Sequence, residues 1–117
     1  MASVTRTATI AESGSLSDAI TIDESMLLGL ILPSSWTTAD LTLQASHDGT
    51  NFANLYDSAG TEVTIKAAAS RYVTLNPADF VGMQAIKLRS GTSGSPVTQT
   101  AERTITVNRK KKMIPAS

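Results

Sequence analysis

The 117-residue chain contains no cysteine and a single histidine, His47. The missing cysteines exclude disulfides, thiolate metal sites and a cysteine nucleophile. One histidine excludes metal sites built from several histidines and leaves few groups for general-base catalysis. Aromatic residues make up only 4% of the chain, too few for a core or a nucleic-acid platform built from stacked rings. These absences favour a structural or binding protein over an enzyme.

Long apolar runs are also missing. The continuous apolar stretch at residues 26–32 is far shorter than the roughly 20 residues that a membrane-spanning helix needs. Residues 1–6 lack the basic and then apolar pattern of a secretion signal. A chain of 12.3 kDa has room for one core of useful size. We therefore expect a soluble, single-domain protein that is made in the cytoplasm and has no membrane partner.

Short alternating segments separated by turn residues make up most of what is present. The Asp48-Gly49 pair favours a tight hairpin turn. Asn76 followed by Pro77 is typical of a helix start, which Gly82 soon ends, so we expect at most one short helix near Pro77–Phe80. Turns about every ten residues predict an all-β fold, a single antiparallel β-sandwich of jelly-roll type. The expected strands cover residues 4–10, 16–22, 26–32, 41–45, 52–56, 63–65, 71–75, 84–90 and 103–107.

The apolar residues of these strands are the predicted core. The run at 26–32, closed by Pro33, predicts a strand buried on both faces, with a buried helical turn as the alternative. The predicted core residues are Ile10, Leu16, Ile22, Leu28, Leu30, Leu32, Leu41, Leu43, Phe52, Leu55, Val63, Ile65, Val73, Leu75, Ile86, Leu88, Ile105 and Val107.

Three segments carry residue types that could support chemistry. His47 and Asp48 could form a catalytic pair or part of a divalent-metal site, but a capped turn with a solvated histidine fits their isolation better. The acidic stretch from Asp57 to Glu62 does not have the spacing of a calcium loop, so turn and strand-edge roles are expected there. The loop at residues 91–95 lacks the lysine of a phosphate-binding loop. We expect no catalytic residue, metal or cofactor.

Charge is divided along the chain although the formal net charge is zero. Residues 1–83 carry nine acidic and three basic side chains, a net charge of −6, whereas residues 84–117 carry seven basic and one acidic, a net charge of +6. Such a division of charge indicates how the protein associates and does not indicate its fold. The acids expected to form an acidic body include Asp18, Asp23, Glu24, Asp40 and Asp48.

The basic end supplies most of the candidate interface residues. We divide the chain into a sandwich domain of residues 1–108 and a basic C-terminal arm of residues 109–117. The arm could bind a polyanion, lie on an acidic protein surface or act as a solubilising tail, and we favour docking on protein. Its apolar residues 113–115 would add a small anchoring contact. The basic candidates are Arg103, Arg109, Lys110, Lys111 and Lys112.

Trp36 is the remaining candidate interface residue, in a loop after Pro33. A lone loop tryptophan can be a sugar-stacking platform or an interface anchor. It can also fold back as a lid over one end of the sandwich, which is the interpretation that we favour.

Several segments together resemble a group of small structural proteins of tailed bacteriophages. The matching segments are Pro33-Ser-Ser-Trp-Thr-Thr-Ala39, residues 43–57, Arg71-Tyr-Val73, residues 87–99 and Arg103-Thr-Ile105, within a span of about residues 30 to 107. The resemblance implies a virion component with a β-sandwich fold and brings no catalytic residues. The lysine-rich end lies outside it.

The resemblance and the composition lead to one functional expectation and one alternative. We expect a non-enzymatic capsid decoration protein, localised to the phage particle, that binds the major capsid protein or another virion protein in many copies. Opposed acidic and basic surfaces would also let copies join into a homo-oligomer such as a trimer. No direct contact with nucleic acid is expected. The alternative is a tail or head-fibre adhesion module that binds a host surface glycan.

Overall fold

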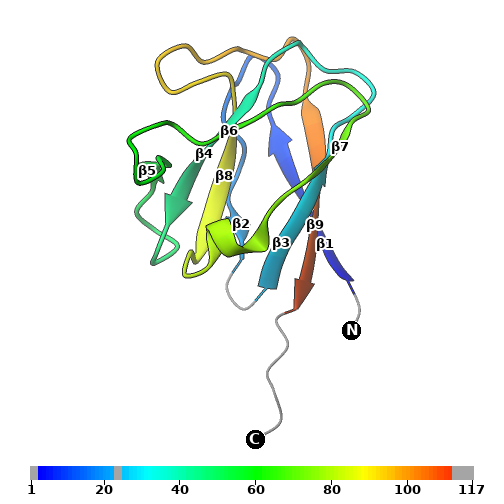
Figure 1. The fold of residues 1–117 in the computed structure, drawn as a ribbon. Coiled ribbons are helices and arrows are strands. Elements are labelled where there is room, and N and C mark those ends of the chain that lie inside the picture. Colours follow the sequence, from blue (N-terminus) through cyan, green and yellow to red (C-terminus); the bar gives the residue numbers. More distant parts are fainter. Residues whose placement is uncertain (1–2, 23–24, 112–117) are drawn as a thin grey trace, which may run out of the picture.

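The computed structural model describes residues 3–22 and 25–111, which form two packed β-sheets (Figure 1). The strands are β1 (Ser3–Ile10), β2 (Ile20–Thr21), β3 (Ser25–Ile31), β4 (Leu41–Ser46), β5 (Ala53–Asn54), β6 (Thr64–Ile65), β7 (Tyr72–Thr74), β8 (Ala85–Ser90) and β9 (Arg103–Lys111), and a 3₁₀ turn, η1, spans Pro77–Phe80.

All strand pairs are antiparallel. Sheet A has the order β1-β9-β3-β7, and sheet B has the order β2-β8-β4-β5, with β6 also paired to β4. The predicted all-β antiparallel sandwich is therefore confirmed. The first and last strands are neighbours along their whole length, in a register that pairs Ser3 with Lys110 and Ile10 with Arg103.

The core follows from the two-residue alternation of the strands, which turns every second side chain inward. In sheet A, Ala8 and Ile10 of β1 and Ile105 and Val107 of β9 are fully buried, while threonines between them point outward. The predicted core residues found buried are Ile10, Ile22, Leu30, Leu32, Leu41, Leu43, Ile65, Ile86, Leu88, Ile105 and Val107. Four others, Leu55, Val63, Val73 and Leu75, are partly buried and pack against this cluster.

Three core predictions are wrong. Leu16 is 37% exposed because it lies opposite Arg89, on the outer side of sheet B, and the expected strand at 16–22 is reduced to β2. Phe52 is half-buried on the same outer side, where the ammonium of Lys87 lies 4.5 Å from its ring centre. Leu28 is half-buried, and its neighbour Leu27 occupies the core instead.

An irregularity in β3 explains the exchange of Leu27 for Leu28. The register between β3 and β9 shifts between Leu27 and Gly29, so the run at 26–32 alternates around a bulge instead of being buried on both faces. On the outer face the ring of Tyr72 lies against Gly29, and its hydroxyl accepts a 2.8 Å hydrogen bond from Asn108. β7 can therefore approach β3 this closely only because Gly29 has no side chain.

The short helix is where the sequence predicts it. The Asn76 side chain accepts a 3.1 Å hydrogen bond from the backbone N–H of Ala78, and Pro77 occupies the first position. Phe80 is buried in the core cluster and fixes η1 against the lower end of the sandwich in Figure 1. Gly82, with φ +90°, turns the chain toward β8.

Gly29→Ala should destabilise the fold for a steric reason alone. A Cβ at this position would lie 2.8 Å from Tyr72 Cε1 and 2.9 Å from the carbonyl oxygen of Val73. We expect the free energy of unfolding to fall by about 1–3 kcal/mol, the usual cost of overpacking, as measured by urea denaturation. Gly94→Ala is the matched control, because nothing lies within 4 Å of its Cβ position; equal stability of the two variants would contradict this explanation.

Candidate functional site

Arg109 belongs to the last strand rather than to an arm. It pairs with Val4 of β1 and Leu27 of β3, so the prediction that the chain leaves the fold after residue 108 is wrong: β9 continues to Lys111. Its side chain points inward, like that of Val107 two residues earlier, and the residue is only 5% exposed. The guanidinium donates a hydrogen bond to the carbonyl oxygen of Thr21 in β2, which ties sheet A to sheet B.

A basic end forms around Arg109 at the lower end of sheet A. Arg6 pairs with Val107 in the β1–β9 register, two residues along β9 from Arg109. Burial lowers the pKa of the Arg109 guanidinium, and the positive charge of Arg6 lowers it further. Lys110 is half-buried, beside Ser3 in the β1–β9 register, and Lys111 ends the strand. We call Arg6, Arg109, Lys110 and Lys111 the basic end. Lys112 and the rest of the predicted arm lie outside the described residues.

Arg103 does not join the basic end, because it lies at the opposite end of β9. Six residues of strand separate it from Arg109, about 20 Å. Its Nε donates a 3.1 Å hydrogen bond to Gln99, and Nη2 donates to the hydroxyls of Thr37 and Thr100. Arg103 therefore lies at the end of the sandwich opposite the basic end, where the loops that carry Thr37 and Gln99 meet. We call this the loop end.

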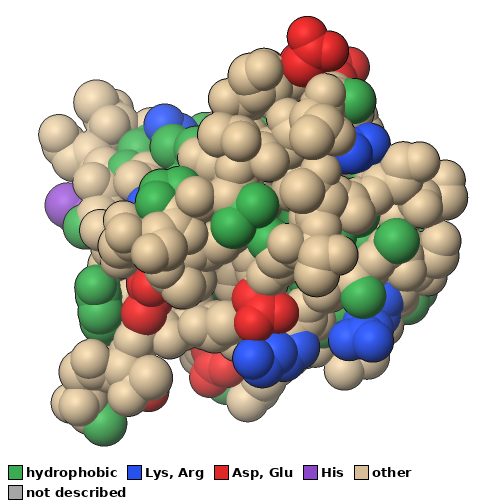
Figure 2. All heavy atoms as spheres, turned by 90° about the horizontal axis from the view of Figure 1, so that it is seen from above, with side chains coloured by type: hydrophobic (Ala, Val, Ile, Leu, Met, Phe, Trp, Pro, Cys, Tyr) green, Lys and Arg blue, Asp and Glu red, His purple; other side chains and the backbone are tan. Residues whose placement is uncertain are grey.

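Trp36 lies in the same loop end as a lid. Its ring is half-buried and packs against the core cluster, while Nε1 donates a 3.1 Å hydrogen bond to the carbonyl oxygen of Ala39. The adjacent Thr37 is held by the fully buried Gln99, whose amide bonds both the N–H and the carbonyl of Thr37 and the hydroxyl of Ser90. Figure 2, which looks onto this end, shows hydrophobic side chains scattered among backbone and other side chains.

The predicted acidic body is divided among separate local contacts. Asp18 accepts a hydrogen bond from the N–H of Thr9, at the edge of β1. Asp40 pairs with Lys66 at 2.9 Å, and this hydrogen bond lowers the pKa of the carboxyl group. Asp40 and Asp48 lie beyond opposite ends of β4, so they cannot share a patch. Asp23 and Glu24 are outside the described residues.

His47 and Asp48 form the capped turn that fits their isolation. Oδ1 of Asp48 accepts 2.8 Å hydrogen bonds from the N–H groups of Thr50 and Asn51, and Oδ2 accepts from the Asn51 side chain. These bonds, those of Asn51 first, hold the Asp48 pKa well below its ordinary value. The imidazole of His47 is 83% exposed. Asp48 therefore stabilises the turn, and His47 is solvated beside it.

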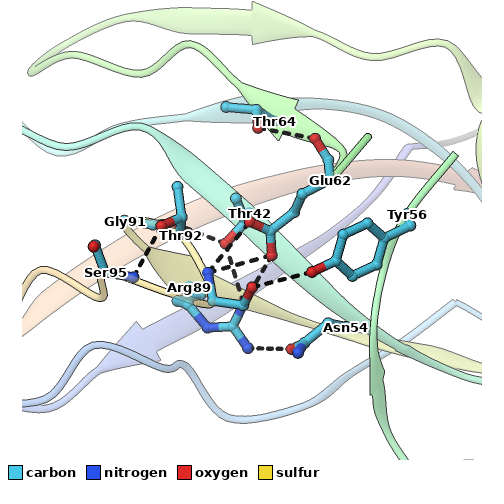
Figure 3. Close-up of polar contacts among 10 residues, drawn as sticks. Thr42, Asn54, Tyr56, Glu62, Thr64, Arg89, Gly91, Thr92 and Ser95 are labelled. Atoms are coloured by element: carbon cyan, nitrogen blue, oxygen red, sulfur yellow. Dashed lines mark hydrogen bonds and ion pairs between the residues drawn. The ribbon is translucent and has the colours of Figure 1, made fainter. Parts of the chain in front are cut away.

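A buried arginine that sequence analysis missed lies on the outer face of sheet B (Figure 3). Arg89 points away from the core, yet its side chain is only 8% exposed because the segment from β5 to Glu62 covers it. The guanidinium lies 3.5 Å from the carboxylate of Glu62, 2.5 Å from Asn54 Oδ1 and 3.3 Å from the hydroxyl of Thr42. The alternation of β8 placed Arg89 on the outer face, but nothing in the sequence marked Glu62 as its partner.

Glu62 also ties in the loop that follows β8. Both of its carboxylate oxygens accept hydrogen bonds of 3.3 Å from the N–H of Ser93. The hydroxyl of Ser93 lies 3.4 Å from that of Tyr56. Asp57, considered above with Glu62, instead accepts hydrogen bonds from the N–H groups of Ala59 and Thr61 and closes a turn. These contacts fix the segment 55–63, a turn closed by the bridge between Tyr56 and Glu62, against sheet B.

A cleft of about 690 Å³ opens between this segment and η1. Three acidic residues, Asp57, Glu62 and Asp79, are among the described residues that line it, and none of those residues is basic. Leu55 and Val63 contribute an apolar part of the surface. The cleft suits an elongated ligand that carries positive charge and an apolar portion.

Comparisons of the chain with protein-family models, with curated proteins and with solved structures give no match. Among residues 3–22 and 25–111, no group of three or more His, Cys, Asp or Glu side chains is arranged to hold a metal ion. The same residues contain no helix long and apolar enough to cross a membrane.

The Asp48 turn should make stability depend on pH. Because folding lowers the Asp48 pKa, the carboxylate stabilises the native state above its ordinary value of 3.8, and this contribution disappears as the pH falls below it. Asp48→Asn should therefore be less stable than the parent at neutral pH, with a difference that shrinks steadily as the pH falls below 3.8. Urea denaturation from pH 7 to pH 2 measures the difference; a difference of constant size over this range would assign the effect to the lost acceptor instead of the charge.

Removing Arg89 should leave the Glu62 carboxylate buried without its charge partner. We expect Arg89→Met to lower the free energy of unfolding by about 3 kcal/mol. The double variant Arg89→Met with Glu62→Met should recover part of this loss, because it removes the stranded charge as well. Thermal and urea denaturation compare the two, and a double variant no more stable than the single one would contradict the role given to the ion pair.

Proposed function

We propose that this protein is a non-enzymatic structural component of a tailed-bacteriophage particle, a decoration protein that binds the capsid surface in many copies. The observation that carries the proposal is the basic end. Arg6 is exposed and Lys110 is half-buried at the end of sheet A that holds the buried Arg109, and Lys111 and Lys112 follow Lys110 directly in the sequence. A rigid sandwich with a cationic end suits attachment to an acidic protein surface.

The rest of the polar structure supports a scaffold role. The buried polar side chains of Gln99 and Arg89 tie loops to the sheets. Both lie in segments that carry the resemblance to phage structural proteins. The loops are thus fixed parts of the sandwich, which can present a surface of constant shape to a neighbour.

Attachment of this kind depends on many weak contacts. An exposed ion pair contributes about 0–1 kcal/mol and weakens with added salt. One copy would therefore bind weakly, and symmetric repetition over a shell would supply the total. Lysines and arginines at the end of β9 add further pairs without changing the fold.

Charge removal at the basic end should lower occupancy on particles. We expect Arg6→Gln with Lys110→Gln to reduce binding to purified particles several-fold, since two ion pairs of up to about 1 kcal/mol each are lost. Higher ionic strength should reproduce the loss for the parent protein. The readout is copy number per particle, measured by quantitative electrophoresis after sedimentation.

A matched control removes two positive charges from the loop end, Lys66→Gln with Arg71→Gln. It should leave occupancy unchanged; equal losses in the two double variants would contradict attachment through the basic end. A few copies per particle, with binding to host glycan that Trp36→Ala abolishes in a folded protein, would favour the adhesion alternative. The half-buried position of Trp36 gives that alternative little support.

A further inference from the structure

A groove extends the acidic cleft along the side of the sandwich. A second hollow of about 290 Å³ shares Val63, Thr64 and Asp79 with the cleft and continues between β6 and β7. β6 pairs only with β4 and β7 only with β3 among the described strands, so the second edge of each borders the groove. Strand edges offer backbone hydrogen bonds to an added extended segment.

The walls of the groove combine apolar surface with negative charge. Val63, Val73 and Leu75 are partly buried residues along its length. Asp57 and Asp79 form no ion pair with a described residue, whereas Glu62 is paired with Arg89 and Lys66 with Asp40. The groove is therefore net negative. It fits an extended peptide with a lysine and a few apolar side chains.

The chain itself contains such a segment directly after β9. Residues 112–117 read Lys-Met-Ile-Pro-Ala-Ser, and Lys110 and Lys111 precede them in the strand. Pro115 disfavours a helix there. Six extended residues span about 20 Å. Charge and apolar content both match.

We propose that this C-terminal segment of one copy occupies the groove of a second copy. At Lys111 the chain still follows β9, whose arrow in Figure 1 points out of the lower end of the sandwich and away from it. Because β9 is directed away from the body of the sandwich at Lys111, we assign the segment to the groove of a neighbouring copy. Lys112 of the segment would then lie near Asp57 and Asp79 of the partner copy.

The contact joins different surfaces of the two copies, a tail on one and a groove on the other. Such a heterologous contact closes into a ring, such as a trimer, or continues as a chain of copies. The inference deepens the proposed function and rests on it for its biological setting. The contact itself can be tested with the purified full chain, so its failure leaves attachment to particles as a separate question.

A peptide titration locates the binding site. An acetylated peptide of residues 110–117 is added to dilute, isotope-labelled full chain, and amide shifts are followed by NMR. We expect saturable shifts confined to the groove, at Val63, Leu75 and Asp79. Asp79→Asn should weaken binding several-fold, whereas the control Glu102→Gln, at the loop end of β9, should not. A peptide with serine in place of Met113 and Ile114 should bind at least tenfold more weakly.

A mixing experiment tests whether the contact joins two copies. A tail variant, Met113→Ser with Ile114→Ser, and a groove variant, Val63→Lys with Asp79→Lys, should each sediment as monomers at concentrations where the parent associates. Mixed, they should form a one-to-one dimer, because one intact tail meets one intact groove. Shifts outside the groove, saturable glycan binding that displaces the peptide, or a parent that stays monomeric would overturn the proposal. Removing residues 112–117 could also change the amide shifts of the groove residues in a protein too dilute to associate. That result would show that the groove holds the chain's own tail, and it would overturn the proposal too.

Discussion

The two-residue alternation of β9 is the constraint on which the rest of the structure depends. This strand pairs with both β1 and β3 and supplies Ile105 and Val107 to the core. The same alternation carries Arg109 inward at the point where apolar residues run out. A charged group in that position must be satisfied, and the carbonyl of Thr21 on the other sheet satisfies it. The alternation that builds the core thus also fixes the place of Arg109 at the basic end.

A similar logic explains the outer face of sheet B. Arg89 leaves the sheet on the side that would ordinarily meet water, and the segment from β5 to Glu62 folds over it. Buried charge is tolerated when it is paired and hydrogen-bonded. Covering Arg89 also places the segment 55–63 where it forms one wall of the cleft. The shape of the cleft therefore depends on the segment that covers and pairs with Arg89.

Local patterns predicted the strands well because each pattern has a local cause. Alternation placed β1, β4, β8 and β9, and the Asn76-Pro77 pair placed η1, since capping involves only near neighbours. The failures all involve distant partners. The bulge at Leu27–Gly29 depends on β9 and Tyr72, and the true end of β9 depends on β1 and β3. The predicted arm at residues 109–117 rested on charge, and charge does not reveal that β1 pairs with β9 as far as Lys110.

The pairing of the first strand with the last has a consequence for how the protein is made. Sheet A cannot close until β9 has left the ribosome, because β1 has no other partner strand among the described residues. Contacts between residues about a hundred positions apart are slow to form, and until then the threonine-rich strand β1 exposes an open edge. Biosynthesis therefore passes through a stage in which nearly the whole chain waits for its final nine-residue strand.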